Sequence, residues 1–293
     1  MGLTMKQKKE NQHKLIQAPR LALGSVTGKI PKKPVFGTKE WAVASVNCVK
    51  GCKHSCRYCF ARYDAIHRFK TMQNETAWAI ETINEKEVNK KRKKVDGTVM
   101  FPTAHDITPQ NCQACLKCIK NILEPGNNIL IVSKPHLVCI EVLCKELMQW
   151  QDHILFRFTI GAMDDNILFY WEPGAPNRTE RFSSLICAQQ AGYRTSVSME
   201  PVLDWDNLEK NIAILSLWIT DSVWVGTMNF IDKRVKIETG EDRARVEAIT
   251  SRQTDEMFQR VYHNLKGNPL VRWKESMKKV LGLPLAEEPG MDV

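Results

Sequence analysis

No run of 18 apolar residues occurs in this sequence, which therefore predicts no membrane-spanning helix and no membrane partner. The first ten residues, MGLTMKQKKE, lack the apolar segment of a secretory signal, and Lys6 stands where a myristoylation signal requires serine or threonine. We therefore expect a cytoplasmic protein. In that reducing compartment the ten cysteines are expected to be metal ligands, reactive groups or core residues rather than disulfides.

A dinucleotide-binding pattern is lacking as well, because no Gly-x-Gly-x-x-Gly follows the first predicted strand. After residue 40, short apolar runs alternate with segments of helical periodicity. The predicted strands are 41–46, 97–101, 128–133, 154–160, 194–199 and 222–226, and the predicted helices are 84–94, 109–124, 136–150, 177–191 and 206–217. This alternation predicts an α/β fold, a partial (β/α)6 TIM-like barrel with its ligands at the C-terminal strand ends. A doubly wound sheet would show the same alternation.

Charge is distributed unevenly among three predicted regions: a basic, flexible leader (1–40), the barrel (41–236) and a C-terminal extension (237–293) read as two helices. The leader holds nine Lys or Arg and two Glu, a net +7, which leaves only +2 of the total +9 for the rest of the chain. Such a block is typical of a solvated terminus, and it could also contact phosphates. A second basic cluster, Lys86 and residues 90–94, lies on a predicted helix and is expected to be exposed.

Three closely spaced cysteines follow the first predicted strand. In GCKHSCRYCFARY, residues 51–63, they are Cys52, Cys56 and Cys59. A loop of this spacing can curl around one object and present three thiolates to it. Three thiolates on a four-iron cluster leave one iron open for a ligand, whereas structural zinc needs a fourth ligand, for which His54 and His67 are candidates. Cys48 is either a fourth cluster ligand or a core residue.

A second run, NCQACLKCIK, contains Cys112, Cys115 and Cys118. It lies at the start of a predicted helix, where steps of three residues turn successive side chains by about 300°, so the thiols drift around the axis. We expect buried core cysteines here. An auxiliary cluster, with Cys139 or Cys144 as a further ligand, is the alternative, and Cys187 is expected in the core.

The first cysteine motif, together with segments further along, resembles the radical S-adenosylmethionine superfamily, and in particular its spore photoproduct lyase-like group. GCKHSCRYCFAR is similar to the cluster loop of that group. TAHDITPQ (103–110) and VSKPH (132–136) are similar to two of its strand ends, and residues 158–204, which include EPGAP, match its longest shared segment. The resemblance covers roughly residues 40–230 and implies a barrel of the radical S-adenosylmethionine type.

That resemblance implies a 4Fe-4S cluster held by Cys52, Cys56 and Cys59, with S-adenosylmethionine on the open iron. Reductive cleavage would yield a 5′-deoxyadenosyl radical that abstracts hydrogen from the substrate. The resemblance also implies an external electron donor of the flavodoxin or ferredoxin type. The implied cofactor-binding residues are Tyr58 beside the adenine, Lys134 at the methionine carboxylate, Thr159, and the strand-end carboxylates Asp106 and Glu200.

The segment MFPTAHDITP (100–109) departs from the family pattern. Spore photoproduct lyase is expected to carry a hydrogen-donating cysteine near this strand end, and this segment has none. Either another donor is used, such as a cysteine of the 112–118 run, or the reaction differs. The substrate is therefore unassigned, with nucleic acid, a peptide or a small metabolite as the options. The alternative function is a non-catalytic protein that binds zinc, an iron–sulfur cluster or nucleic acid.

Overall fold

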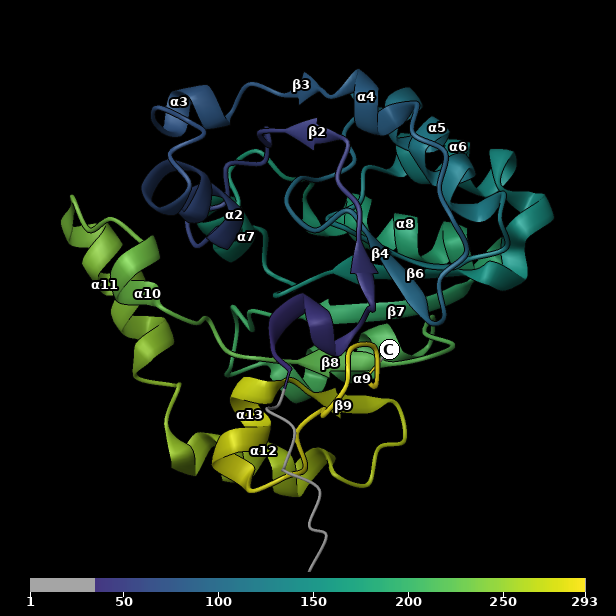
Figure 1. Ribbon diagram of the computed structural model, residues 1–293. Helices are drawn as coiled ribbons and strands as arrows, with labels where there is room; N and C mark the ends of the chain where they lie inside the picture. Colours follow the sequence, from purple (N-terminus) through teal and green to yellow (C-terminus); the bar gives the residue numbers. More distant parts are fainter. Residues whose placement is uncertain (1–34, 293) are drawn as a thin grey trace, which may run out of the picture. The chain divides into compact units, whose positions relative to one another are not determined.

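Seven parallel strands form the main sheet of the computed structural model, which describes residues 35–292. The spatial order of the strands follows their order in the chain, so each crossover leads to the neighbouring strand (Figure 1). The strands are β1 (Ala44–Ser45), β4 (Thr98–Phe101), β5 (Asn128–Ser133), β6 (Ile154–Thr159), β7 (Arg194–Met199), β8 (Val223–Val225) and β9 (Val271–Trp273). With β1 and β9 as its edges, the sheet is a partial TIM-like barrel, as the sequence predicts, with seven strands in place of the predicted six.

The helices between the strands cover the outer face of the sheet. They are α5 (Cys112–Leu123), α6 (Leu137–Glu146), α8 (Arg178–Gln190) and α9 (Leu208–Ser216), with η3 (Met148–His153) after α6. The helix α7 (Asp165–Trp171) instead belongs to a separate cluster with Leu203 and Met228, against which Tyr58 packs. The side chains of β6 are buried on both faces: Phe156 and Phe158 pack against the helices, whereas Leu155 packs inside the barrel against Trp41 and Trp224. Strands buried on both faces are characteristic of parallel sheets.

Short elements follow β1 and carry the cysteine loop. Two-residue strands β2 (Val49–Lys50) and β3 (Thr82–Ile83) pair in antiparallel fashion. Between them lie α2 (Phe60–Tyr63), the π-helical turn η2 (Asp64–Arg68) and α3 (Glu75–Trp78). The strand predicted at 41–46 gives no indication of this antiparallel pair of β2 and β3. The first strand is also shorter than predicted, because Trp41 closes the 3-10 helix η1 (Gly37–Glu40) and only residues 44–45 pair with β4.

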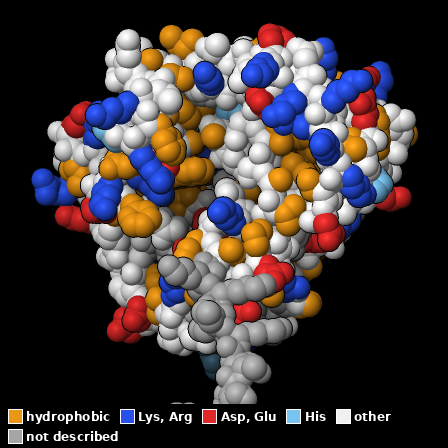
Figure 2. Space-filling model, viewed as in Figure 1, with side chains coloured by type: hydrophobic (Ala, Val, Ile, Leu, Met, Phe, Trp, Pro, Cys, Tyr) orange, Lys and Arg blue, Asp and Glu red, His pale blue; other side chains and the backbone are white. Residues whose placement is uncertain are grey.

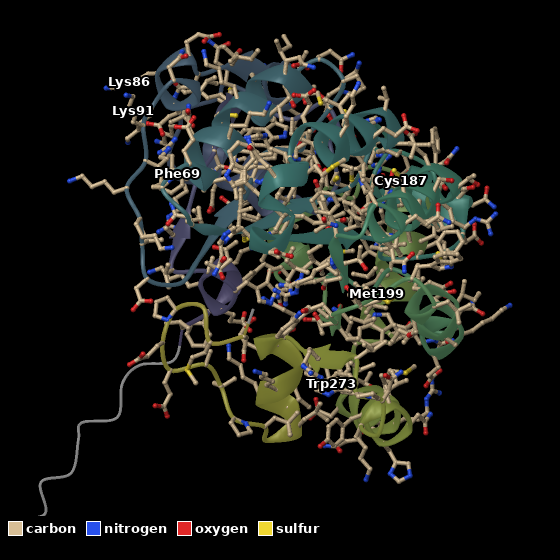
Figure 3. The ribbon with its side chains drawn as sticks, turned by 90° about the vertical axis from the view of Figure 1, so that its right-hand side faces the viewer. Phe69, Lys86, Lys91, Cys187, Met199 and Trp273 are labelled. Atoms are coloured by element: carbon tan, nitrogen blue, oxygen red, sulfur yellow. The ribbon has the colours of Figure 1, made fainter. Side chains whose placement is uncertain are left out.

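The helix predicted over 84–94 is wrong beyond residue 88. Only α4 (Glu85–Val88) forms, and the chain then runs as irregular backbone to β4. Tertiary hydrogen bonds replace helical ones there: the Asn127 side chain accepts from Val95 N at 2.8 Å and donates to Lys93 O at 3.0 Å. The lysines of this segment are exposed as predicted, and Lys86 and Lys91 point away from the sheet (Figure 3). The prediction is wrong for Arg92, whose side chain is 14% exposed and lies 2.9 Å from the Glu87 carboxylate.

The C-terminal extension differs from the two predicted helices. Its elements are α11 (Gly240–Thr250), α12 (Asp255–Leu265), β9 and α13 (Glu275–Leu281), preceded by α10 (Ile231–Arg234). The helical reading is therefore wrong for residues 271–273, which pair with β8 as the seventh strand. Val271 and Trp273 are buried and Arg272 is exposed. A strand of three residues is too short for this alternation to outweigh the helical pattern around it.

Within residues 35–292, no helix is long and apolar enough to cross a membrane. Residues 1–34 of the predicted leader lie outside the described residues, so its flexibility stays a prediction. Its last residues, however, pack against the C-terminal part of the chain. Glu40 is buried, and its carboxylate lies 2.8 Å from the ammonium of Lys274, which is 1% exposed.

Candidate functional site

The C-terminal ends of the strands surround a cavity of about 590 Å³. Figure 2 shows a hollow in this region, between α2, β4 and β8 of Figure 1, with hydrophobic and basic side chains around it. All eight residues predicted to bind metal or cofactor line this cavity: Cys52, Cys56, Cys59, Tyr58, Asp106, Lys134, Thr159 and Glu200. Their individual roles stay predictions, but the parallel strand order brings them to one place.

The cysteine loop begins at Gly51, whose φ of +83° favours glycine. A Cβ at this position would also collide with the carbonyl oxygens of Trp78 and Ile80. The loop then makes two tight turns, in which Ser55 N donates to Cys52 O at 3.3 Å and Cys59 N donates to Cys56 O at 3.2 Å. At its end, the sulfur of Cys59 caps α2 by accepting from Arg62 N at 3.4 Å.

The EPGAP turn after α7 supports the cysteine loop from outside the cavity. Gly174 N donates to His54 O at 3.0 Å, and Arg57 N donates to Trp171 O at 2.9 Å. A Cβ on Gly174 would lie 3.0 Å from His54 Cα and closer still to Lys53 O. The glycine of the motif is therefore required for close packing of two backbones and not for an unusual φ.

Glu172, in the same motif, is the centre of a buried network of charges beside Cys56. Its Oε2 lies 2.5 Å from an Arg181 guanidinium nitrogen, and both side chains are fully buried. Its Oε1 accepts from the hydroxyl of Tyr58 and lies 3.9 Å from Nζ of Lys134. Although burial alone raises the pKa of Glu172, the charges of Arg181 and Lys134 hold it below its usual value.

Lys134 follows β5 and points into the cavity, with its ammonium 5.8 Å from the centre of the Tyr58 ring. Burial by itself lowers the pKa of this lysine. Electrostatic interactions with Cys56, Glu172 and Asp106 outweigh that effect and raise the pKa above its usual value. Lys134 is thus a permanent cation within a group of acceptors, positioned for an anionic ligand.

Asp106 joins the cysteine loop to the end of β5. Its Oδ2 accepts from His54 Nδ1 at 3.0 Å, and its Oδ1 accepts from the hydroxyl of Ser133 and from Lys134 N at 3.0 Å. On its other side, the buried His54 ring places Nε2 3.1 Å from Nε2 of His136. Both ring nitrogens of His54 are therefore occupied, and the ring does not complete a zinc site with the cysteines.

The opposite wall of the cavity is formed by the ends of β6 to β9. Thr159 ends β6, and Glu200 follows β7 with its carboxylate 3.4 Å from Lys274 Nζ. Burial raises the pKa of Glu200, and the nearby charge of Lys274 opposes this only in part. Lys274 comes from the segment after β9, so the seventh strand, which the sequence pattern missed, contributes directly to this wall.

The three cysteines line the cavity together, as the ligands of an iron–sulfur cluster would. Among residues 35–292, no three side chains of His, Cys, Asp or Glu are arranged to hold one metal ion. In an iron–sulfur cube each thiolate binds a different iron, so the sulfurs need not converge. Burial raises the pKa of the Cys56 thiol to about 12, and metal binding would therefore release protons. His67, the other candidate zinc ligand, is exposed and outside the cavity lining.

No protein-family model and no curated protein matches the chain. Several solved structures of spore photoproduct lyase do match. The lyase complexed with dinucleoside spore photoproduct has a TM-score of 0.54 and 12% identity, over 84% of this chain and 79% of that chain. A single mutant with the same dinucleoside has a TM-score of 0.53, and a double mutant with bound AdoMet and the dinucleoside has 0.52. These two are each 13% identical over 82% of this chain and 78% of theirs.

The chain shares the fold of spore photoproduct lyase. This confirms, for the fold, the resemblance seen in the sequence. At such low sequence identity, the likeness to spore photoproduct lyase concerns the backbone fold and not the reaction.

The remaining cysteines lie apart from the cavity. Cys112, Cys115 and Cys118 are on α5, which is helical from its first cysteine, and all three are buried in the core as predicted. Cys48 is their neighbour, with its sulfur 3.8 Å from that of Cys115, and so belongs to the core. None of the four lines the cavity, so none is placed to be the substitute for the hydrogen-donating cysteine of spore photoproduct lyase.

Residues of the site that were missed in the sequence include Glu172, Arg181 and His136, besides Lys274. Glu172 and Arg181 stand in the segment matched to the spore photoproduct lyase-like group, and that match was the signal that could have identified them. His136 follows Lys134 by two residues. It gave no signal, because its partner His54 is 82 residues away in the chain.

Proposed function

We propose that this chain is a radical S-adenosylmethionine enzyme, in which Cys52, Cys56 and Cys59 hold a 4Fe-4S cluster. The observation that carries the proposal is the gathering of these three thiols and the buried cation of Lys134 around one cavity. When bound and reduced by a flavodoxin- or ferredoxin-type donor, such a cluster supplies the electron for cleavage of S-adenosylmethionine to a 5′-deoxyadenosyl radical.

The chain's own residues would bind and orient the cofactor. Lys134 pairs with the methionine carboxylate, because its ammonium is held charged next to Cys56. Tyr58, fixed by its hydroxyl on Glu172, offers its ring to the adenine. Thr159 and Glu200 supply hydrogen-bonding groups on the opposite wall. The apolar inner side chains, such as Met100 and Trp41, exclude water from the reacting atoms.

For the substrate, we propose a nucleic acid that enters with an unstacked base. Phe60 and Phe230, 42% and 60% exposed, both line the cavity mouth. The guanidinium of Arg234 lies 6.0 Å from the centre of the first ring and 5.1 Å from that of the second. Exposed aromatic rings next to a cation suit base stacking combined with a phosphate contact. The spore photoproduct lyase structures that share this fold contain a dinucleoside.

Radical chemistry is tested by anaerobic reconstitution with iron and sulfide, reduction by dithionite with S-adenosylmethionine present, and an assay for 5′-deoxyadenosine. Wild type should form the product and Cys56→Ala should not. Cys187→Ala is the matched control and should retain formation, because Cys187 lies on α8 outside the cavity lining (Figure 3). Wild-type protein that contains zinc, assembles no cluster and forms no product would favour the non-catalytic metal-binding alternative.

The substrate proposal is tested by the affinity for a fluorescent single-stranded oligonucleotide at several salt concentrations. Phe230→Ala should lose about 1–3 kcal/mol of stacking. Arg234→Ala should reduce the slope of log affinity against log salt by about 1. Phe169→Ala serves as control, since this ring is 73% exposed on α7 and is not part of the cavity lining. An unchanged affinity in the first two variants would leave a peptide or small metabolite as the substrate.

A further inference from the structure

Two buried hydrogen-bond routes connect the cysteine loop to the end of β5. In the first route, His54 donates to one oxygen of Asp106, and the other oxygen accepts from Ser133 and Lys134. The second route is direct, from His54 Nε2 to His136 Nε2 at 3.1 Å. His54 stands midway between Cys52 and Cys56, so both routes reach the centre of the loop that presents the thiols.

Asp106 has no capacity left for a cofactor. Its carboxylate accepts from the His54 ring, the Ser133 hydroxyl, Lys134 N and, at 3.2 Å, Ile107 N. Four donors match the roughly four lone-pair sites of a carboxylate. The residue is also only 7% exposed. Although Asp106 lines the cavity, its hydrogen bonds are directed into the protein and link the cysteine loop to the strand end that carries Lys134.

His136 is itself held in place from α8. Its Nδ1 lies 3.3 Å from Oε1 of Glu180, which also accepts from Leu137 N at 3.1 Å. The His136 ring therefore has a partner on each nitrogen, and its orientation is fixed from two sides. A His136 ring held in this way fixes the position of His54 relative to α6 and α8.

We infer that His136 and Asp106 are positioning residues, which act through His54 to fix the cysteine loop relative to Lys134. The inference rests on the proposed function, because it concerns the cluster that the loop would hold. The consequence is specific: loss of either link should loosen the cluster and alter its electronic environment while leaving the fold intact. Hydrogen-bonded partners behind metal ligands typically change metal affinity by roughly 10- to 100-fold when removed.

The experiment compares reconstituted wild type, His136→Leu, His136→Gln and Asp106→Asn, with His153→Leu as matched control. His153 is exposed and has a single hydrogen-bond partner, Asn128, far from the loop in the chain. The readouts are the rate of iron loss to a chelator, the electron paramagnetic resonance spectrum and midpoint potential of the reduced cluster, and the melting temperature of the metal-free protein.

We expect iron loss to be faster by roughly 10- to 100-fold in His136→Leu and Asp106→Asn, with an altered spectrum and potential. His136→Gln should stay near wild type, because its amide can replace the lost hydrogen bond, and His153→Leu should be unchanged. Wild-type behaviour of the cluster in His136→Leu would overturn the inference and leave the proposed function standing. So would iron loss that follows a lower melting temperature equally in the Leu and Gln variants. Failure of the wild type to assemble any cluster would instead remove the proposed function and the inference together.

Discussion

Because the EPGAP turn lies so close to the cysteine loop, we predict that one added methyl group at Gly174 lowers the stability of the protein. In Gly174→Ala, the new Cβ would lie 3.0 Å from His54 Cα and closer to Lys53 O, and both are backbone atoms that cannot rotate away. The two segments must separate, which also lengthens the 3.0 Å hydrogen bond from Gly174 N to His54 O. Overpacking of this kind costs about 1–3 kcal/mol. For a chain of this size we expect the melting temperature to fall by roughly 2 to 12 °C.

Gly267→Ala is the matched control for this prediction. A Cβ at Gly267 meets no atom within 4 Å, and its φ lies outside the left-handed region. This substitution should be neutral or stabilising by about 0.4–1 kcal/mol, through the lower entropy of the unfolded chain. Thermal unfolding of the two variants, followed by circular dichroism, measures the difference directly. Iron content after reconstitution should fall only in Gly174→Ala. Equal melting temperatures for both variants would refute the argument that this glycine holds the loop in place.

Three further predictions concern the stability of the metal-free protein. Arg181→Leu should cost about 3–5 kcal/mol in chemical denaturation, because it removes the nearest cation of the fully buried Glu172 carboxylate and leaves only Lys134 at 3.9 Å; a cost below about 1 kcal/mol would contradict a charged Glu172. The hydroxyl of Tyr170 donates to Asp242 at 2.7 Å. Of the several hydrogen bonds that hold the pKa of Asp242 well below its usual value, this one has the largest effect. Asp242→Asn should therefore lower the melting temperature at pH 7. The difference in melting temperature between the variant and wild type should decrease as the pH falls below about 4, because protonation removes the same stabilisation from wild type. A difference that does not depend on pH would count against this reasoning. Thr254→Ala, which removes the N-cap of α12, should cost about 1 kcal/mol, and an unchanged melting temperature would show that this helix end is held in another way.

The apolar runs that form β4, β5, β6, β7 and β8 were assigned correctly as strands, because they are mostly buried and each carries its own signal. Of the run at 41–46, only Ala44–Ser45 forms a strand. The errors occurred where tertiary contacts outweigh local preference. Residues 89–94 have a helical pattern, yet their backbone is irregular, and the side chain of Asn127 bonds the Lys93 carbonyl and the Val95 N–H. Val271–Trp273 has only three residues, and its pairing with β8 joins residues that are 48 positions apart in the chain.

The candidate site divides in the same way. Tyr58, Lys134 and Thr159 could be predicted because each stands at a strand end or in the cysteine loop, within a motif that can be read along the chain. The supporting partners could not. Glu172 meets Tyr58 across 114 residues, and Asp106 meets His54 across 52, so neither pair leaves a pattern at any fixed spacing.

By itself, the sequence determined which chemical groups this protein has: three thiols within eight residues, a lysine and carboxylates at strand ends, and apolar runs that form a parallel sheet. The tertiary structure decided which of these groups meet. Parallel strands place the loops after their C-terminal ends at one edge of the sheet, and strand order alone sets which loops are neighbours. For that reason the links from His54 to Asp106 and His136, and from Glu172 to Arg181 and Tyr58, emerged only from the fold.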